Sequence, residues 1–155
     1  MRKTIVSQLV RFADEPQWID LERAARFECT SERPDHPIEA ALSASPGSGW
    51  RADQPGEQTI RLLFDEPRDI RHIRVVFIEA ETERTQEFVL RWSTGPEQPL
   101  REIVRQQWNF SPNGSISEAE GYSVQLRRVS LLELAIRPDI SGRIAVASLR
   151  ELRIA

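Results

Sequence analysis

Three stretches of this sequence place tryptophan, arginine or asparagine where they could contact a ligand with many hydroxyl groups. An indole ring can pack on the C–H face of a sugar, while guanidinium, amide and carboxylate groups hydrogen-bond its hydroxyls. The first stretch follows a glycine-rich segment, the second surrounds the turn signal SPNG, and the third, residues 79–86, contains a single arginine. The candidate ligand-binding residues are Trp50, Arg51, Asp53, Arg84, Trp108, Asn109 and Asn113.

Trp50 has two interpretations that the residues alone leave open. It lies in a loop rich in glycine and proline, immediately before a predicted strand. Such a ring either forms a platform for a ligand or closes a corner of the fold. Gly47 and Gly49 favour the corner, because glycine lets the backbone wrap closely around a large ring. Trp18 is expected to cover a sheet edge or a partner, and Trp92 is in phase with core residues.

Catalytic residues are not predicted. The two histidines, His36 and His72, are far apart in sequence, and no G-x-S-x-G elbow presents a serine. The motif that cradles phosphates is also missing from the sequence. Glutamates alternate at 79, 81 and 83 and again at 118 and 120, a spacing that we expect on solvated strand faces rather than in a glycosidase. The sequence therefore predicts a protein without enzymatic activity.

Composition limits the partners and the compartment. The 155 residues suit a single domain, and the net charge of -3 argues against nucleic acid as a partner. All but one of the 21 basic side chains are arginines. Cys29 is the only cysteine, so no disulfide forms within the chain. Neither a signal-peptide core nor a membrane-spanning apolar run is recognisable, so we expect a cytoplasmic protein.

Side chains alternate between apolar and polar along most of the chain, as expected for β-strands with one buried face. Turn signals separate these segments: DEPRD, STGPEQP, SPNG and RPDISG. The pattern predicts an all-β, antiparallel β-sandwich (jelly roll) of about eight strands. One short helix is expected within residues 35–44, capped by Asp35, and DLERAA is expected to form a turn. The predicted strands are 25–30, 59–64, 72–80, 87–93, 101–108, 122–129, 131–138 and 148–155.

The order of several motifs resembles the discoidin, or coagulation factor 5/8 type C, family of the galactose-binding-domain-like jelly rolls. The resemblance covers about residues 20–155. It rests on the segments CTSE (29–32), HPIEAAL (36–42), GWRADQPGEQTIRLLFDEP (49–67), IRHIRVVF (70–77), TQEFVLRWS (85–93), QWNFSP (107–112) and ASLRELRI (147–154).

This resemblance implies a sandwich whose loops at one end bind a ligand without chemical turnover. Family members bind carbohydrates, phospholipid head groups or proteins. The resemblance also implies that Trp50 packs into a corner of the sandwich, and that the QWNFSP segment around Trp108 forms another corner.

Many family members hold a structural calcium, and the resemblance assigns one ligand of that ion to Glu151. The other ligands would be an aspartate and carbonyls in the loop after the short helix. That loop departs from the family, because no carboxylate lies between Glu39 and Asp53. Calcium prefers six to eight oxygen ligands, several of them carboxylates. We therefore expect no cofactor and no retained calcium.

Two functions remain open from the sequence. The first is a non-catalytic binding module, with a carbohydrate as its ligand. The second is a protein-interaction or self-assembly module, favoured by apolar Val76 and Ile78 on the nominally outer phase of a strand. A fold of this type hosts both functions, so the fold alone does not decide between them.

Overall fold

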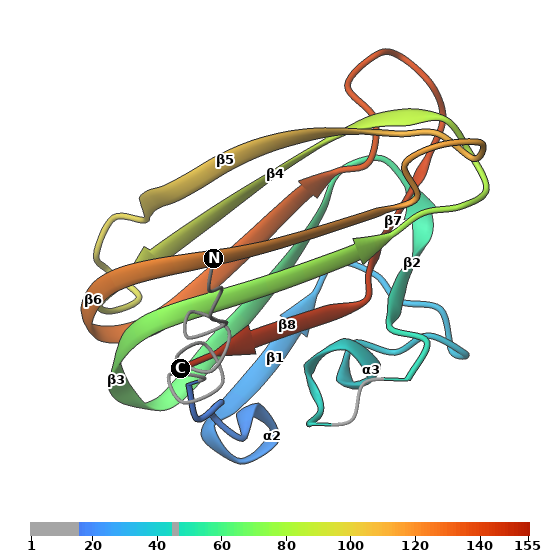
Figure 1. The fold of residues 1–155 in the computed structure, drawn as a ribbon. Helices are drawn as coiled ribbons and strands as arrows, with labels where there is room; N and C mark the ends of the chain where they lie inside the picture. Colours follow the sequence, from blue (N-terminus) through green and yellow to red (C-terminus); the bar gives the residue numbers. More distant parts are fainter. Residues whose placement is uncertain (1–15, 45–46) are drawn as a thin grey trace, which may run out of the picture.

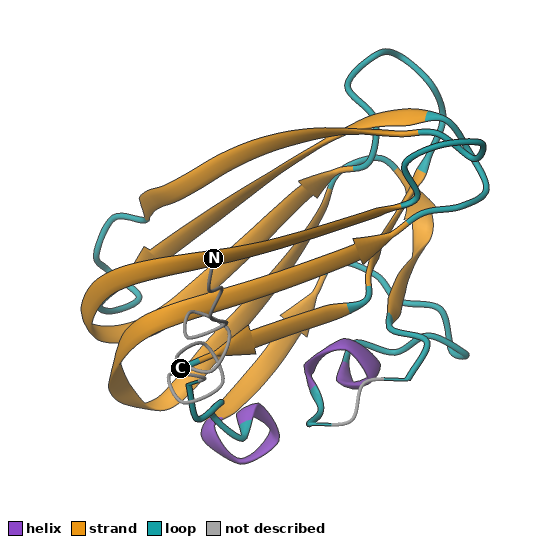
Figure 2. Ribbon diagram, viewed as in Figure 1, coloured by secondary structure: helices purple, strands orange, loops and turns teal. Residues whose placement is uncertain are grey.

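The computed structural model describes residues 16–44 and 47–155. Its strands pair antiparallel throughout the described chain, which confirms the predicted all-β sandwich (Figure 2). The described residues include two four-residue helices, where the sequence predicted one helix and a turn. In chain order the elements are α2 (Leu21–Ala24), β1 (Ala25–Cys29), α3 (Glu39–Leu42), β2 (Trp50–Pro55), β3 (Gln58–Ile78), β4 (Arg84–Ser93), β5 (Arg101–Phe110), β6 (Ser117–Arg137), β7 (Val146–Leu149) and β8 (Glu151–Ile154).

The two long strands, β3 and β6, contribute to both layers of the sandwich (Figure 1). The first half of β3 pairs with β1 and with the second half of β6, which also pairs with β4; β5 then forms the edge. The second half of β3 lies between β8 and the first half of β6 in the other layer. β2 and β7 form a separate two-stranded ribbon.

The segment DEPRD lies inside β3, so the prediction of a turn there was wrong. The β3–β6 pairing shifts register between Leu63 and His72, and Arg128 on β6 has a positive φ of 58°. Pro67 cannot donate to a strand ladder, and this bend is where the ladder is interrupted. A bulged bend between two layers therefore exposes the same polar residues that a true turn would expose.

Trp50 closes a corner of the sandwich. Its side chain is 1% exposed, and its indole N–H donates to the carbonyl of Ser31 at 3.0 Å. Gly49 precedes it with φ of 80°, and a Cβ there would lie 2.5 Å from the Leu149 carbonyl oxygen. The structure thus supports the corner interpretation, since the glycine permits this close approach between β2 and the end of β7.

The inward-facing residues of β3, β4 and β6 contribute a large part of the core, which residues of β2, β5, β7, β8 and the two helices complete. Phe77 of β3 packs on Phe88 of β4 with ring centroids 5.1 Å apart. Trp92, predicted as core, is half-buried and packs against this cluster.

The predicted N-cap of the short helix was wrong. The N-cap of α3 is Ile38, whose N–H donates to the Glu32 carboxylate at 2.7 Å, while Asp35 pairs with Arg33.

Three loops gather at one end of the sandwich, which we call the loop end. They are residues 79–83 between β3 and β4, residues 111–116 between β5 and β6, and residues 138–145 between β6 and β7 (Figure 1). The β4–β5 connection, residues 94–100, lies at the opposite end. None of the helices in the described part of the chain has the length and apolar character to span a membrane.

Candidate functional site

Backbone hydrogen bonds hold the three loops of the loop end together. The N–H of Glu79 donates to the Ile116 carbonyl at 2.7 Å, which joins the first loop to the second. The N–H of Ile140 donates to the Thr85 carbonyl at 2.8 Å, which joins the third loop to the start of β4. Side chains from segments far apart in sequence are therefore held close together at this end.

A buried ion pair lies at the loop end, where β3 finishes and β4 begins. Arg84 Nη2 is 3.4 Å from Glu79 Oε1, and both side chains are 3% exposed. Arg84 Nη1 donates to the Val146 carbonyl at 2.7 Å, and the Ser148 hydroxyl donates to Glu79 Oε2 at 3.1 Å. Glu79 Oε1 and Arg84 Nε have no hydrogen-bond partner among the described residues. The pair is therefore well anchored but keeps hydrogen-bonding capacity.

Arg51 lies beside this pair. In the β2–β7 ribbon Arg51 is opposite Ser148, so the two side chains share a face of the ribbon. Burial lowers the pKa of Arg84, the charge of Glu79 opposes that effect, and the charge of Arg51 lowers the pKa further. The structure thus brings together Arg51 and Arg84, two of the predicted ligand contacts. Arg51 is half-buried, so it is the member of the cluster that a ligand meets first.

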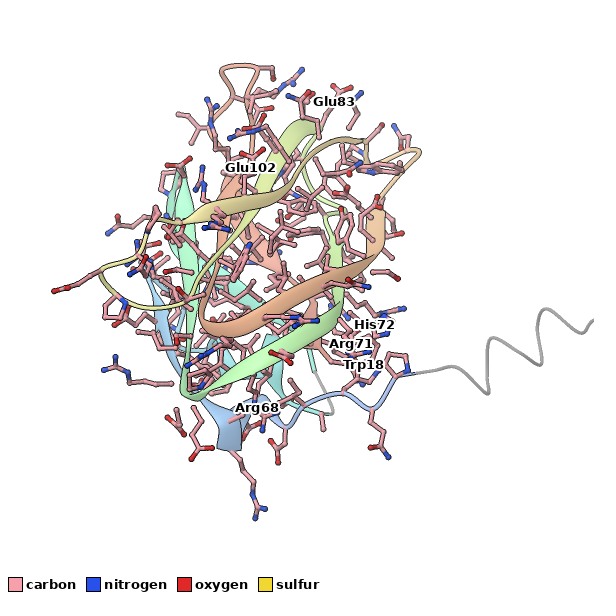
Figure 3. The ribbon with its side chains drawn as sticks, turned by 90° about the vertical axis from the view of Figure 1, so that its left-hand side faces the viewer. Trp18, Arg68, Arg71, His72, Glu83 and Glu102 are labelled. Carbon is pink, nitrogen blue, oxygen red and sulfur yellow. The ribbon has the colours of Figure 1, made fainter. Side chains whose placement is uncertain are left out.

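The third loop is stiffened by Asp139. Burial alone would raise the pKa of this carboxylate, but hydrogen bonds from the Thr85 N–H, the Ser141 hydroxyl and two further backbone N–H groups lower it to about 2. Arg143 Nη2 reaches Glu83 in the first loop at 3.6 Å, and Figure 3 shows Glu83 near the top of the view. Ile144 is 86% exposed, which gives the loop end an apolar contact at its rim.

The remaining predicted contacts lie at or near the same end, but not in the cluster of Arg51 and Arg84. Trp108 is half-buried and donates its indole N–H to the Ser115 hydroxyl at 3.0 Å. Asn109 accepts a hydrogen bond from the Thr85 hydroxyl at 2.7 Å, and Asn113 is exposed in the second loop. Asp53 is exposed on β2, where its N–H donates to the Ser31 hydroxyl. Trp50 and Arg84 are 1% and 3% exposed, so neither predicted contact lies on the outer surface.

The expectation that the alternating glutamates are all solvated was wrong for two of them. Glu79 continues the buried phase of Val75 and Phe77. Glu118 shares the phase of Tyr122 on β6 and is 2% exposed, with no hydrogen-bond partner for either carboxylate oxygen. Strand phase was the signal in the sequence that pointed to both positions, because alternate side chains face the same layer.

Glu118 carries a strongly shifted pKa. Burial raises it, and the charge of the neighbouring Glu120 raises it further, to about 7. Tyr122 lies on the same face of β6, and burial followed by the charges of both glutamates raises its pKa to about 12. Its hydroxyl donates to the side-chain oxygen of Gln106 across the two layers at 3.3 Å. The space between the start of β6 and β5 is therefore lined by polar side chains.

The residues near Glu151 do not fit a calcium ion. Its carboxylate forms ion pairs with Arg153 and, at 3.9 Å, with Arg74. Among the residues that the structure describes, no group of three histidine, cysteine, aspartate or glutamate side chains could hold a metal ion. Bound calcium would have to displace two guanidinium groups.

A second surface also combines an aromatic ring with arginine and histidine. Figure 3 shows Trp18, Arg71 and His72 together, away from Glu83. The backbone explains the arrangement, because Ile19 donates to the Ile154 carbonyl and Arg71 and His72 both donate to the Ala155 carbonyl. Trp18 is half-buried, so part of its ring remains accessible. This surface is an alternative location for a ligand.

A hollow of about 730 Å³ opens beside the free edge of β1. Phe27, Cys29, Glu32, Glu39 and Arg61 are among the residues that line it. None of the seven predicted ligand contacts is part of this lining. The hollow is therefore separate from the loop end.

Comparison with known proteins shows the fold of this chain. Neither a protein-family model nor a curated protein sequence matches it. Solved structures do match: the family 32 carbohydrate-binding module of NanJ from Clostridium perfringens, in complex with galactose, superposes with a TM-score of 0.59 at 12% identity, covering 88% of this chain and 96% of that one.

Two further modules match to a similar degree. The family 32 module of AlyQ, in complex with 4,5-unsaturated mannuronic acid, has a TM-score of 0.59 at 13% identity over 90% of this chain and 98% of its own. A pectin-binding carbohydrate-binding module has a TM-score of 0.58 at 15% identity over 84% and 89% of the two chains. This chain therefore has the galactose-binding-like sandwich fold that its motifs indicated.

Proposed function

We propose that this protein is a non-catalytic module that binds carbohydrate at the loop end of the sandwich. The observation that carries the proposal is the cluster of Arg51, Glu79 and Arg84. Arg51 is half-buried, so its guanidinium is accessible, and its charge lies beside the buried ion pair of Glu79 and Arg84. Sandwiches of the same fold have been solved with galactose and with an unsaturated uronic acid bound, which supports a sugar as the ligand.

The accessible guanidinium of the cluster is that of Arg51, which is half-buried and donates to a sugar hydroxyl. Glu79 and Arg84 are each 3% exposed, so they lie beneath Arg51 and do not contact the ligand themselves. The exposed side chain of Ile144 provides apolar contact for the C–H groups of the ring. Because the ion pair is held by Val146 and Ser148, it is positioned before the ligand arrives, which lowers the entropic cost of binding.

Calorimetric titration with a saccharide panel tests this proposal. The panel contains galactose, N-acetylgalactosamine, uronic acids and short pectin and alginate oligosaccharides. We expect saturable binding of at least one ligand, weakened at least about tenfold by Arg51→Ala, the loss that corresponds to about 1.4 kcal/mol. The matched control is Arg23→Ala on α2, where the arginine side chain is 90% exposed. Ligand recovered unchanged after prolonged incubation is the expected sign that turnover does not occur.

A Trp18→Ala variant tests the alternative surface. Loss of binding in Trp18→Ala, with binding kept in Arg51→Ala, would move the site to the surface of Trp18, Arg71 and His72. No heat with any saccharide, together with a sedimentation coefficient of a dimer or larger species, would overturn carbohydrate binding in favour of self-assembly. Circular dichroism of each variant establishes that it is folded.

Self-assembly is the less supported alternative. Val76 and Ile78, the apolar residues on the outer phase, are half-buried. The exposed large hydrophobic residues of the described chain are Leu100, Ile116 and Ile144, and Leu100 lies at the end opposite the other two. Stable dimers bury broader apolar surfaces than these isolated side chains offer.

A further inference from the structure

A guanidinium group joins the last strand to the loop that follows α3. Glu151 and Arg153 lie on the same, outward-facing side of β8, because Leu152 and Ile154 between and beside them are buried. Arg153 pairs with the Glu151 carboxylate through Nε and donates from Nη2 to the Ala44 carbonyl at 2.9 Å. One cation therefore contacts both a carboxylate of the strand and a carbonyl of the loop.

These two contacts are of the kind that the family resemblance assigns to calcium, a glutamate of the last strand and a carbonyl after the short helix. The guanidinium contacts both groups here in place of a metal ion: Nε pairs with the Glu151 carboxylate, and Nη2 donates to the Ala44 carbonyl. Both side chains are largely shielded, with 15% of Glu151 and 27% of Arg153 exposed. Shielding from water makes such a charge-assisted contact stronger than one on an open surface.

The charge around Glu151 also opposes a divalent cation. Arg74, opposite Arg153 in the β3–β8 pairing, brings a second guanidinium to within 3.9 Å of Glu151 Oε2. Two positive groups thus face one carboxylate, and the sequence supplies no carboxylate between Glu39 and Asp53. A calcium ion placed there would meet repulsion and too few anionic oxygens.

We propose that the guanidinium of Arg153 replaces the structural calcium of related sandwiches, so that this protein holds the chain at Ala44, just after α3, without a metal. The replacement is independent of the proposed carbohydrate site. It makes stability insensitive to calcium and to chelators, while stability depends on the cation of Arg153 and the carboxylate of Glu151.

Thermal unfolding of the full chain tests the proposal. Wild-type protein dialysed against EDTA and protein in millimolar calcium are expected to have the same Tm, and calorimetric titration with calcium chloride is expected to give no binding heat. Arg153→Gln is expected to lower Tm by roughly 2–4 °C, and adding calcium is expected not to restore it. A rise in wild-type Tm with calcium, reversed by EDTA, would overturn the proposal.

A double-mutant cycle separates the ion pair from general packing. Glu151→Gln and Arg153→Gln are expected to lower Tm by less in combination than the sum of the single changes. The matched control cycle uses the exposed pair Arg33–Asp35, 3.2 Å apart, where the changes are expected to add. If Arg153→Gln does not fold, Arg153→Lys serves instead. If Arg153→Lys has a Tm close to that of the wild type, the positive charge is what stabilises the protein. If the Tm losses of Arg153→Lys and Glu151→Gln simply add in the double variant, the two side chains do not act as a pair, and the proposal is contradicted.

Discussion

Substitution of Glu118 by glutamine should make the protein more stable at neutral and alkaline pH. Glu118 is 2% exposed and unpaired, and its pKa rises from an ordinary value of 4.5 to about 7. The native state therefore binds this proton more tightly than the unfolded chain does. As the pH rises from 4.5 to about 7, the native state pays an increasing cost for ionising a buried carboxylate, and stability falls over that window.

The size of the effect follows from the shift. Since one pKa unit corresponds to about 1.36 kcal/mol, the rise from 4.5 to about 7 amounts to roughly 3 kcal/mol of stability lost above pH 7. Glu118→Gln keeps the shape of the side chain and removes the ionisation. At pH 8 the variant should exceed the wild type by up to about 3 kcal/mol, and at pH 4 the two should be nearly equal.

Urea denaturation from pH 4 to pH 8 measures this difference. The difference between the two proteins reports Glu118 together with its coupling to Glu120, because the carboxylates farther away are the same in both. The matched control is Glu81→Gln, which removes a carboxylate from an exposed position at the same end. Parallel profiles for wild type and Glu118→Gln would refute the reasoning, because they would mean that Glu118 is ionised and solvated in the native state.

Three further outcomes follow from the loop end and its corner. Glu79→Gln and Arg84→Gln should each cost about 3 kcal/mol in urea denaturation, and the double variant less than their sum, because each single change leaves a buried partner unpaired; additive losses would contradict the pairing. Asp139→Asn should lower the urea midpoint at pH 7, and since the pKa of Asp139 falls from 3.8 to about 2, the difference from wild type should disappear as the pH falls through that range. Gly49→Ala should cost more than about 1 kcal/mol in thermal unfolding, because its φ is 80° and the new Cβ would lie 2.5 Å from a carbonyl oxygen. Gly47→Ala, with open space around the Cβ, is the matched control and should be close to neutral.

The strands were predictable because alternation of side chains is a local property. Ile73, Val75 and Phe77 mark a buried face whatever the rest of the chain does, and the structure buries all three. The bends of β3 and β6 were not predictable in the same way. A polar, proline-containing segment such as DEPRD is compatible with a turn and with a bulge, and only pairing to β6 decides between them.

The candidate site was predictable in part. Arg51 and Arg84 were recognised by residue type, since arginine suits both sugar hydroxyls and carboxylates. Ser148 was not recognised, because a serine has no distinctive signal and contacts a glutamate 69 residues away. Trp50 illustrates the opposite limit: its residue type suits a platform as well as a corner, the neighbouring glycines favoured the corner, and burial at 1% exposure decides for the corner.

By itself, the sequence determined the class of fold, the faces of the strands and the residue types available for binding, because these depend on side-chain chemistry and on neighbours a few positions away. The tertiary structure decided which of those residues meet. It buried Glu79 and Glu118, for which strand phase had given only a signal, and it set Arg153 between a carboxylate and a loop carbonyl, which the sequence could not show. The physical reason is that burial and charge pairing depend on strand register and layer packing, which join residues far apart in the chain.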